Sequence, residues 1–344
     1  MKRSVSRALR WVLTIAIVVF LVIFARTINW TEAWHSIRSA SLPLLGIAVA
    51  VNLSTVIIKA IRWWVFLKPA GSPSLPLAVR ATVAGAGLNN VLVANGGDAA
   101  RVVFVSRATG IPSSTILATL ALERLFDPVG FVILLVFGVL AFRLPPSLEK
   151  WHWPAVAALV IMAGLLVWFV YASRNAKPEH VPERRAHARG LAGRVRAYLV
   201  KFAASTQSLT TGSRFIAALG LALLAWAGQL ITFHYAANAA HVDIPMAGSL
   251  AALLAINLGL LIRATPGNVG FFQFVFALAV APFGVERNDA IAVSLLIQTL
   301  QILPVTLLGV MLAPEFIFRR KPAEPTSGPV VEESDELAGT SGEP

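Results

Sequence analysis

Long apolar runs alternate with short polar segments along the whole chain, and this pattern predicts membrane-spanning helices. A spanning helix needs about 20 apolar residues, with about 17 to 25 tolerated. Six segments meet this length or nearly so: residues 9–25, 42–64, 115–142, 153–171, 215–237 and 290–313. The first segment follows a basic amino terminus and has no small-residue cleavage site after it, so we expect an uncleaved signal anchor.

Two further apolar stretches, residues 77–105 and 246–284, are each interrupted near the centre by Gly, Asn or Pro. The first breaks at residues 89–90 and 95–98, and the second breaks at residues 265–270. Irregular backbone within a membrane is tolerated only where protein or a water-filled cavity satisfies it. We therefore expect two re-entrant hairpins, although two short spans in each stretch would return the chain to the same side.

Composition excludes a soluble enzyme. Of the 344 residues, 57% are hydrophobic and 13% are charged, whereas soluble domains carry about 25% charged residues. The chain has no Cys, which excludes disulfide frameworks, zinc fingers and thiol nucleophiles, and its six His form no metal-binding helix pair. We expect neither a metal nor a cofactor. The net charge of +12 lies in short segments beside apolar runs, which indicates membrane topology and not nucleic-acid binding.

Basic residues also predict the orientation. The amino terminus, the loop at 174–201 with its eight Lys and Arg residues, and residues 319–321 should all be cytoplasmic. The segment at 42–64 would then run inward and leave Lys59, Arg62 and Lys68 on the cytoplasmic side. Both termini are expected in the cytoplasm.

The order of segments predicts an internal repeat. Each half reads span, span, interrupted hairpin, span, and the two halves start on opposite sides of the membrane. We therefore expect an all-α polytopic membrane protein with about 6–8 transmembrane helices and two re-entrant hairpins in an inverted-topology repeat, an arrangement that places a binding site near the midplane in transporters. The expected repeats are residues 1–152 and 153–314, followed by a disordered acidic tail at 315–344.

Ionisable groups within the membrane are costly and are therefore candidates for function. Glu123 and Asp127 share one face of their predicted helix at i and i+4, and Arg124 is offset from them. Glu123 would lie about 15 Å along the axis, close to mid-bilayer. The three residues could line a cavity, or they could form a network of ion pairs that holds helices together.

A second candidate is Gly97-Asp98-x-x-Arg101 in the first interrupted stretch. Asp98 could cap the following helix, and Arg101 lies one turn later on the same face. A helix amino terminus with an arginine can hold a phosphate. An ordinary capped turn, with an arginine whose side chain extends to the membrane interface, would give the same sequence pattern.

A third candidate is formed by Arg263, Thr265, Pro266 and Gly267 in the second interrupted stretch. Pro266 at a helix start, followed by glycine, predicts a half-helix whose amino terminus points inward. Arg62 is a weaker candidate. Because it precedes two tryptophans, we interpret it first as an anchor at the membrane interface and only second as a site residue.

The chain resembles the flippase-like transmembrane domain of lysylphosphatidylglycerol synthases from about residue 10 to about 315. The resemblance rests on the order of these motifs: Arg62, residues 85–89, Gly97-Asp98-x-x-Arg101, Glu123-Arg124-x-x-Asp127 and Thr265-Pro266-Gly267-x-x-Gly270. Stand-alone members of this large family include some associated with hopanoid biosynthesis. The resemblance implies a protein of the bacterial cytoplasmic (inner) membrane that moves or handles polar lipids. The synthase domain has no counterpart here, so we do not expect an enzyme.

These observations favour a lipid translocase whose substrate is a polar or anionic membrane lipid. A membrane scaffold that docks a soluble lipid-biosynthesis enzyme is the alternative, with loop 174–201 and the tail as docking surfaces. A membrane-embedded transferase is third, because a single Glu–Asp pair gives it little support. No ATP-binding P-loop is present, so transport would be passive, ion-coupled or driven by consumption of the product.

Overall fold

The computed structural model describes residues 38–91, 96–142, 145–150, 212–259 and 270–318, with isolated positions at 31 and 34, within 153–164 and at 268. Within these residues the chain is helical and contains no strand. The predicted segment at 9–25, the basic loop and most of the segment at 153–171 and of the tail lie outside the described residues.

Four long helices confirm four of the six predicted spans. They are α3 (Leu42–Gly71), α6 (Ser113–Ala141), α10 (Gly212–Ala239) and α13 (Arg287–Phe318), and each is long and apolar enough to cross a membrane. Two helices end at least five residues later than the sequence predicts. α3 continues through apolar residues to Gly71, where Ser72 adopts the left-handed conformation, and α13 runs into the first residues of the predicted tail. Lys59 and Arg62, which lie near the end of the predicted segment, are therefore followed by about two further turns of α3.

Both interrupted stretches are divided into two short helices at the predicted breaks. The first forms α4 (Leu75–Val91) and α5 (Gly96–Thr109), and the second forms α11 (Met246–Gly259) and α12 (Phe271–Val280), which η3 (Ala281–Phe283) continues. At 1.5 Å per residue the longest of these, α4, extends about 26 Å, which is less than the hydrocarbon core of about 30 Å. A four-residue helix, α7 (Pro146–Glu149), follows α6.

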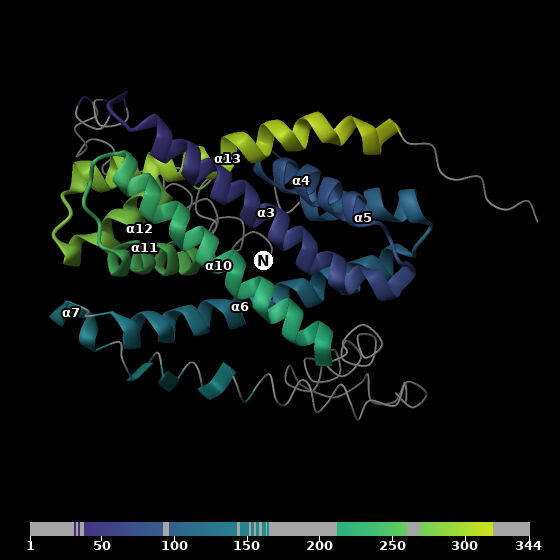
Figure 1. Cartoon of the computed structure of the whole chain (residues 1–344), viewed down its shortest axis with the longest axis horizontal. Helices are drawn as coiled ribbons and strands as arrows, with labels where there is room; N and C mark the ends of the chain where they lie inside the picture. The colour runs from purple at the N-terminus through teal and green to yellow at the C-terminus, as the bar shows by residue number, and fades with distance from the viewer. Residues whose placement is uncertain are drawn as a thin grey trace, which may run out of the picture.

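α3 and α10 pack side by side in opposite directions through the middle of the molecule (Figure 1). At one end the Ser41 amide donates to the Ala239 carbonyl at 2.8 Å, and at the other Phe66 packs with Ala218. Between these ends Gly228 faces Thr55, and a Cβ on Gly228 would lie 2.4 Å from the Thr55 hydroxyl. The glycine is therefore what allows the two helices to approach closely.

α4 lies against α13 (Figure 1), and glycines again set the distance. A Cβ on Gly309 would lie 2.6 Å from the Gly87 Cα, and nearby the Asn90 amide donates to the Thr306 hydroxyl at 2.9 Å. The last helix of the described chain thus holds the first helix of the first hairpin.

Corresponding elements of the two halves make corresponding contacts. α3 contacts α4 and α10 contacts α11, while α5 contacts α6 and α12 contacts α13. Together with the antiparallel pairing of α3 and α10, this is what an inverted repeat requires. The division of the chain into repeats at residue 153 stays a prediction.

Candidate functional site

Three helices of the first half bring the charged candidates together. α3 supplies Arg62 from its interior, α5 supplies Asp98 and Arg101 from its first turns, and α6 supplies the remaining three from its third and fourth turns. The predicted residues that meet in one cluster are Arg62, Asp98, Arg101, Glu123, Arg124 and Asp127. Arg263, Thr265, Pro266 and Gly267 lie outside the described residues.

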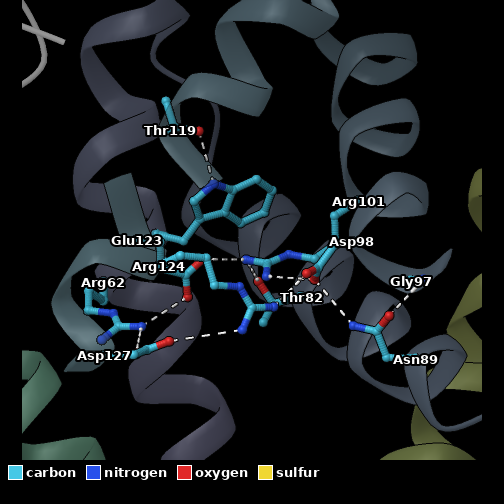
Figure 2. Close-up of polar contacts among 11 residues, drawn as sticks. Arg62, Thr82, Asn89, Gly97, Asp98, Arg101, Thr119, Glu123, Arg124 and Asp127 are labelled. Carbon is cyan, nitrogen blue, oxygen red and sulfur yellow. Dashed lines mark hydrogen bonds and ion pairs between the residues drawn. The ribbon is translucent and has the colours of Figure 1, made fainter. Parts of the chain in front are cut away.

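The six side chains form a closed ring in which arginines and carboxylates alternate, and we call them the charge ring. Figure 2 shows the polar contacts of these side chains and of the residues around them. The ion pairs, in order around the ring, are Arg62–Glu123 at 3.4 Å, Glu123–Arg101 at 3.1 Å, Arg101–Asp98 at 3.7 Å, Asp98–Arg124, Arg124–Asp127 at 3.9 Å and Asp127–Arg62 at 2.8 Å. Three positive charges face three negative charges, so the ring is electrically neutral.

The ring is buried on one side and open on the other. The exposed fractions of the side chains are 1% for Arg62, 6% for Glu123, 7% for Arg101, 22% for Asp98, 35% for Asp127 and 57% for Arg124. The longest ion pair, between Arg124 and Asp127, lies on the open side. A ligand that approaches the ring would therefore meet Arg124 first.

Arg62, Glu123 and Arg101 form the buried arm of the ring. Neutral side chains hold this arm in place. The Arg101 guanidinium lies 4.1 Å from the centre of the Trp63 ring and donates to the Thr82 hydroxyl at 3.2 Å. The Trp63 indole in turn donates to Thr119 at 3.0 Å. The Trp63 side chain is fully buried beneath an arginine and therefore does not lie at the surface of the molecule.

The hairpin that carries Asp98 is closed by Asn89 of α4. The Asn89 amide nitrogen donates to Asp98 at 3.2 Å, and its oxygen accepts from the Gly97 backbone amide at 2.9 Å. Glycines permit this packing, because a Cβ on Gly85 would lie 2.3 Å from the Arg101 side chain. Residues 85–89 thus form the wall against which Arg101 and the first turn of α5 are packed.

Arg62 has unused hydrogen-bonding capacity. One terminal nitrogen, Nη2, donates to both Glu123 and Asp127, while Nε and Nη1 are buried with no hydrogen-bond partner, as is Nε of Arg101. A buried donor without a partner is costly. The position of Arg62 also corrects the interpretation of it as an interfacial anchor first, because only 1% of its side chain is exposed.

The corresponding region of the second half is polar but uncharged in its described part. The amide of Gln273 on α12 donates to Gln298 on α13 at 2.7 Å, and its oxygen accepts from the Gly270 backbone amide at 2.6 Å. Across the described ranges, no group of three or more His, Asp or Glu residues could hold a metal ion. The charged chemistry of the described structure is therefore gathered in the first half.

Sequence reasoning missed the neutral partners Trp63, Thr82 and Thr119, and it also missed Lys59 beside the ring. Asn89 entered it only as the end of the motif at residues 85–89. The only signals of the missed residues were a polar residue within an apolar run and the helical spacing of Lys59 and Arg62. Neither signal indicates which neighbouring helix the side chain will meet.

Comparison with known proteins agrees with the resemblance carried by the motifs. The sequence profile described as the lysylphosphatidylglycerol synthase TM region matches residues 11–309. The chain is also similar to a UPF0104 membrane protein of Pyrococcus horikoshii, with 22% identity over 300 residues that cover 78% of this chain and 86% of the relative. The match suggests a membrane protein of lipid metabolism or transport. The chain belongs to the family of lysylphosphatidylglycerol synthase transmembrane regions.

Proposed function

We propose that the protein is a lipid translocase that moves a polar or anionic lipid across the cytoplasmic membrane, with both termini in the cytoplasm. The observation that carries this proposal is the neutral charge ring with Arg124 exposed in the interior of a membrane-length helix. An arginine there requires water, a counter-charge or a ligand. In the structure Asp98 and Asp127 supply the counter-charge. In this proposal the lipid headgroup takes over part of that role at Arg124, and the acyl chains stay in the bilayer.

The ring suggests how a headgroup could enter without leaving charges unpaired. The Arg124 guanidinium is held by Asp98 and, more loosely, by Asp127 at 3.9 Å. A headgroup oxyanion that approaches from the open side could replace the looser carboxylate at Arg124, while Asp127 keeps its 2.8 Å contact with Arg62. An exchange of ligands of this kind avoids the large cost of an uncompensated charge.

Reconstitution tests the proposal. Purified protein in liposomes with headgroup-labelled lipids is expected to speed exchange between leaflets, and Arg124→Ala is expected to reduce that rate at least about tenfold by removing the first contact. Arg107→Ala is the matched control, because Arg107 lies exposed in the last turn of α5 and outside the ring. Equal rates with and without folded protein, across anionic and zwitterionic lipids, would overturn the proposal and favour the scaffold.

A further inference from the structure

Lys59 lies beside the charge ring, and among the described residues its ammonium group has no partner of its own. It lies one helical turn before Arg62 on α3, and i and i+3 residues share a helix face. Its side chain is half-buried, and within the described residues no hydrogen bond or ion pair holds its ammonium group. The charges of four ring members act on it, with Asp127 the strongest of the four.

The direction of the helices explains this position. Trp63 of α3 meets Thr119 of α6, and Arg62 meets both Glu123 and Asp127, so α3 and α6 run in opposite directions at the ring. One turn back along α3 therefore corresponds to one turn forward along α6, which places Lys59 at the level of Asp127 or just beyond it.

Charge balance then indicates what is missing from the site. The ring is neutral by itself, so Lys59 adds one positive charge for which the described part of the site has no counter-charge. An uncompensated charge within an apolar segment is costly. A ligand with one net negative charge would bring the site back to neutrality, whereas a ligand with no net charge would not.

The unused donors indicate the shape of that ligand. Nε and Nη1 of Arg62 and Nε of Arg101 are buried without acceptors. A guanidinium presents its N–H groups as a planar fork that suits the oxygens of phosphate and carboxylate, while a lysine ammonium acts as a point charge. Two arginine forks and one point charge suit a phosphodiester, which has two charge-sharing oxygens and a single negative charge.

We propose that the charge ring and Lys59 together bind a phosphodiester headgroup with one net negative charge, and that Lys59 is the residue that selects for this charge. A zwitterionic headgroup contains the same phosphodiester but brings its own cation, which would compete with Lys59. The proposal deepens the proposed function by naming a substrate class and rests on it for a lipid as the source. Binding can nevertheless be measured whether or not the protein moves lipid.

Equilibrium binding to the purified full chain in detergent tests this inference with three probes. They are phosphatidylglycerol, phosphatidylcholine and glycerophosphoglycerol, the soluble deacylated headgroup of the first. We expect the wild-type protein to bind phosphatidylglycerol about tenfold more tightly than phosphatidylcholine, a ratio that corresponds to one charged hydrogen bond. Lys59→Gln should reduce this ratio to about twofold, and Lys59→Arg, which keeps the charge, should largely restore it.

The control is Lys68→Gln, because Lys68 lies in the last turn of α3 against Trp64 and outside the ring. It should leave the ratio unchanged. A ratio that persists in Lys59→Gln, a ratio lost equally in Lys68→Gln, or the absence of a preference in the wild type would each overturn the inference. If Lys59→Gln does not fold, Lys59→Met, which removes the charge and keeps the length of the side chain, takes its place.

The remaining comparisons separate this inference from the proposed function. If the soluble headgroup binds as tightly as the lipid, with the same dependence on Lys59, the inference stands with a free phosphodiester as the source and the translocase proposal loses its support. If liposomes exchange anionic and zwitterionic lipids equally well, and Lys59→Gln changes nothing, the translocase proposal stands and the selectivity assigned to Lys59 is wrong.

Discussion

Nη2 of Arg62 on α3 lies 2.8 Å from Oδ1 of Asp127 on α6, and the same nitrogen lies 3.4 Å from Glu123 one turn earlier. A single buried nitrogen thus spans two successive carboxylates of another helix. α6 cannot slide along α3 without breaking one of these contacts. The buried arm of the ring is therefore a fixed point, and any opening of the ring is expected on the side of Arg124.

Removal of the central carboxylate should destabilise the protein. Glu123→Gln would leave Arg62 and Arg101 buried without their shared negative charge, and breaking a buried pair in this way costs about 3 kcal/mol of unfolding free energy. Reversible unfolding in mixed detergent would measure the loss. Glu149→Gln, at an exposed position on α7, should change stability by less than about 0.5 kcal/mol.

The same contact can be separated from general damage by a double-mutant cycle. Arg101→Gln combined with Glu123→Gln should cost less than the sum of the single changes, by at least about 1 kcal/mol, because each single change already breaks their 3.1 Å ion pair. Strict additivity would show that the two groups do not interact in the folded protein.

Glycine contacts predict which helix faces tolerate a side chain. Gly228→Leu should separate α3 from α10, since even a Cβ there lies 2.4 Å from Thr55, and we expect loss of at least about 2 kcal/mol of stability. Gly220→Leu is the matched control on the same helix, because no atom lies within 4 Å of its Cβ position. Equal tolerance of both substitutions in a thermal unfolding series would contradict the close α3–α10 packing.

The contact between the first hairpin and the last helix can be tested by cross-linking. The chain has no Cys, so Asn90→Cys with Thr306→Cys introduces the only thiols, at two side chains that are 2.9 Å apart in the structure. Mild oxidation in the membrane should link them in high yield. Addition of Gly309→Leu should lower that yield several-fold, because a Cβ at this position already lies 2.6 Å from the Gly87 Cα. A cross-linking yield that is unchanged by Gly309→Leu would mean that α4 does not pack against α13 at Gly309.

Much of the fold could be predicted because its signals are local. Asn89 and Asn90 at the end of α4 and the glycines that begin α5 mark the break between these helices wherever the neighbours lie. Glu123 and Asp127 share a face simply because they are one turn apart. The lengths of the apolar runs likewise predict α3, α6, α10 and α13.

The closure of the ring could not be predicted, because its contacts join residues far apart in the sequence. Arg62 meets a carboxylate 65 positions away, and nothing in its own segment distinguishes a buried arginine from one at the membrane interface. The burial of Trp63 under Arg101 has the same origin. Such contacts depend on the crossing of helices, which the hydrophobic pattern of each helix leaves open.

Asp127 offers a test of the proposed exchange of carboxylate for headgroup. In the resting ring it shares Arg62 with Glu123 and makes the looser contact with Arg124, so it is the carboxylate that an incoming anion would replace. Asp127→Asn keeps the shape but removes the competing charge. We expect anionic lipid to bind more tightly, by about fivefold, and to leave more slowly, because Asp127 no longer competes with the lipid for the two arginines.

In liposomes this variant should therefore reach its half-maximal exchange rate at a lower mole fraction of anionic lipid, while the maximal rate falls. Asp243→Asn, in the exposed connection between α10 and α11, should change neither quantity. A variant with weaker binding and an unchanged maximal rate would mean that Asp127 contacts the ligand directly. In that case the headgroup would displace Asp98 from Arg124. The Arg124–Asp98 contact would then open, and the Arg124–Asp127 contact would stay closed.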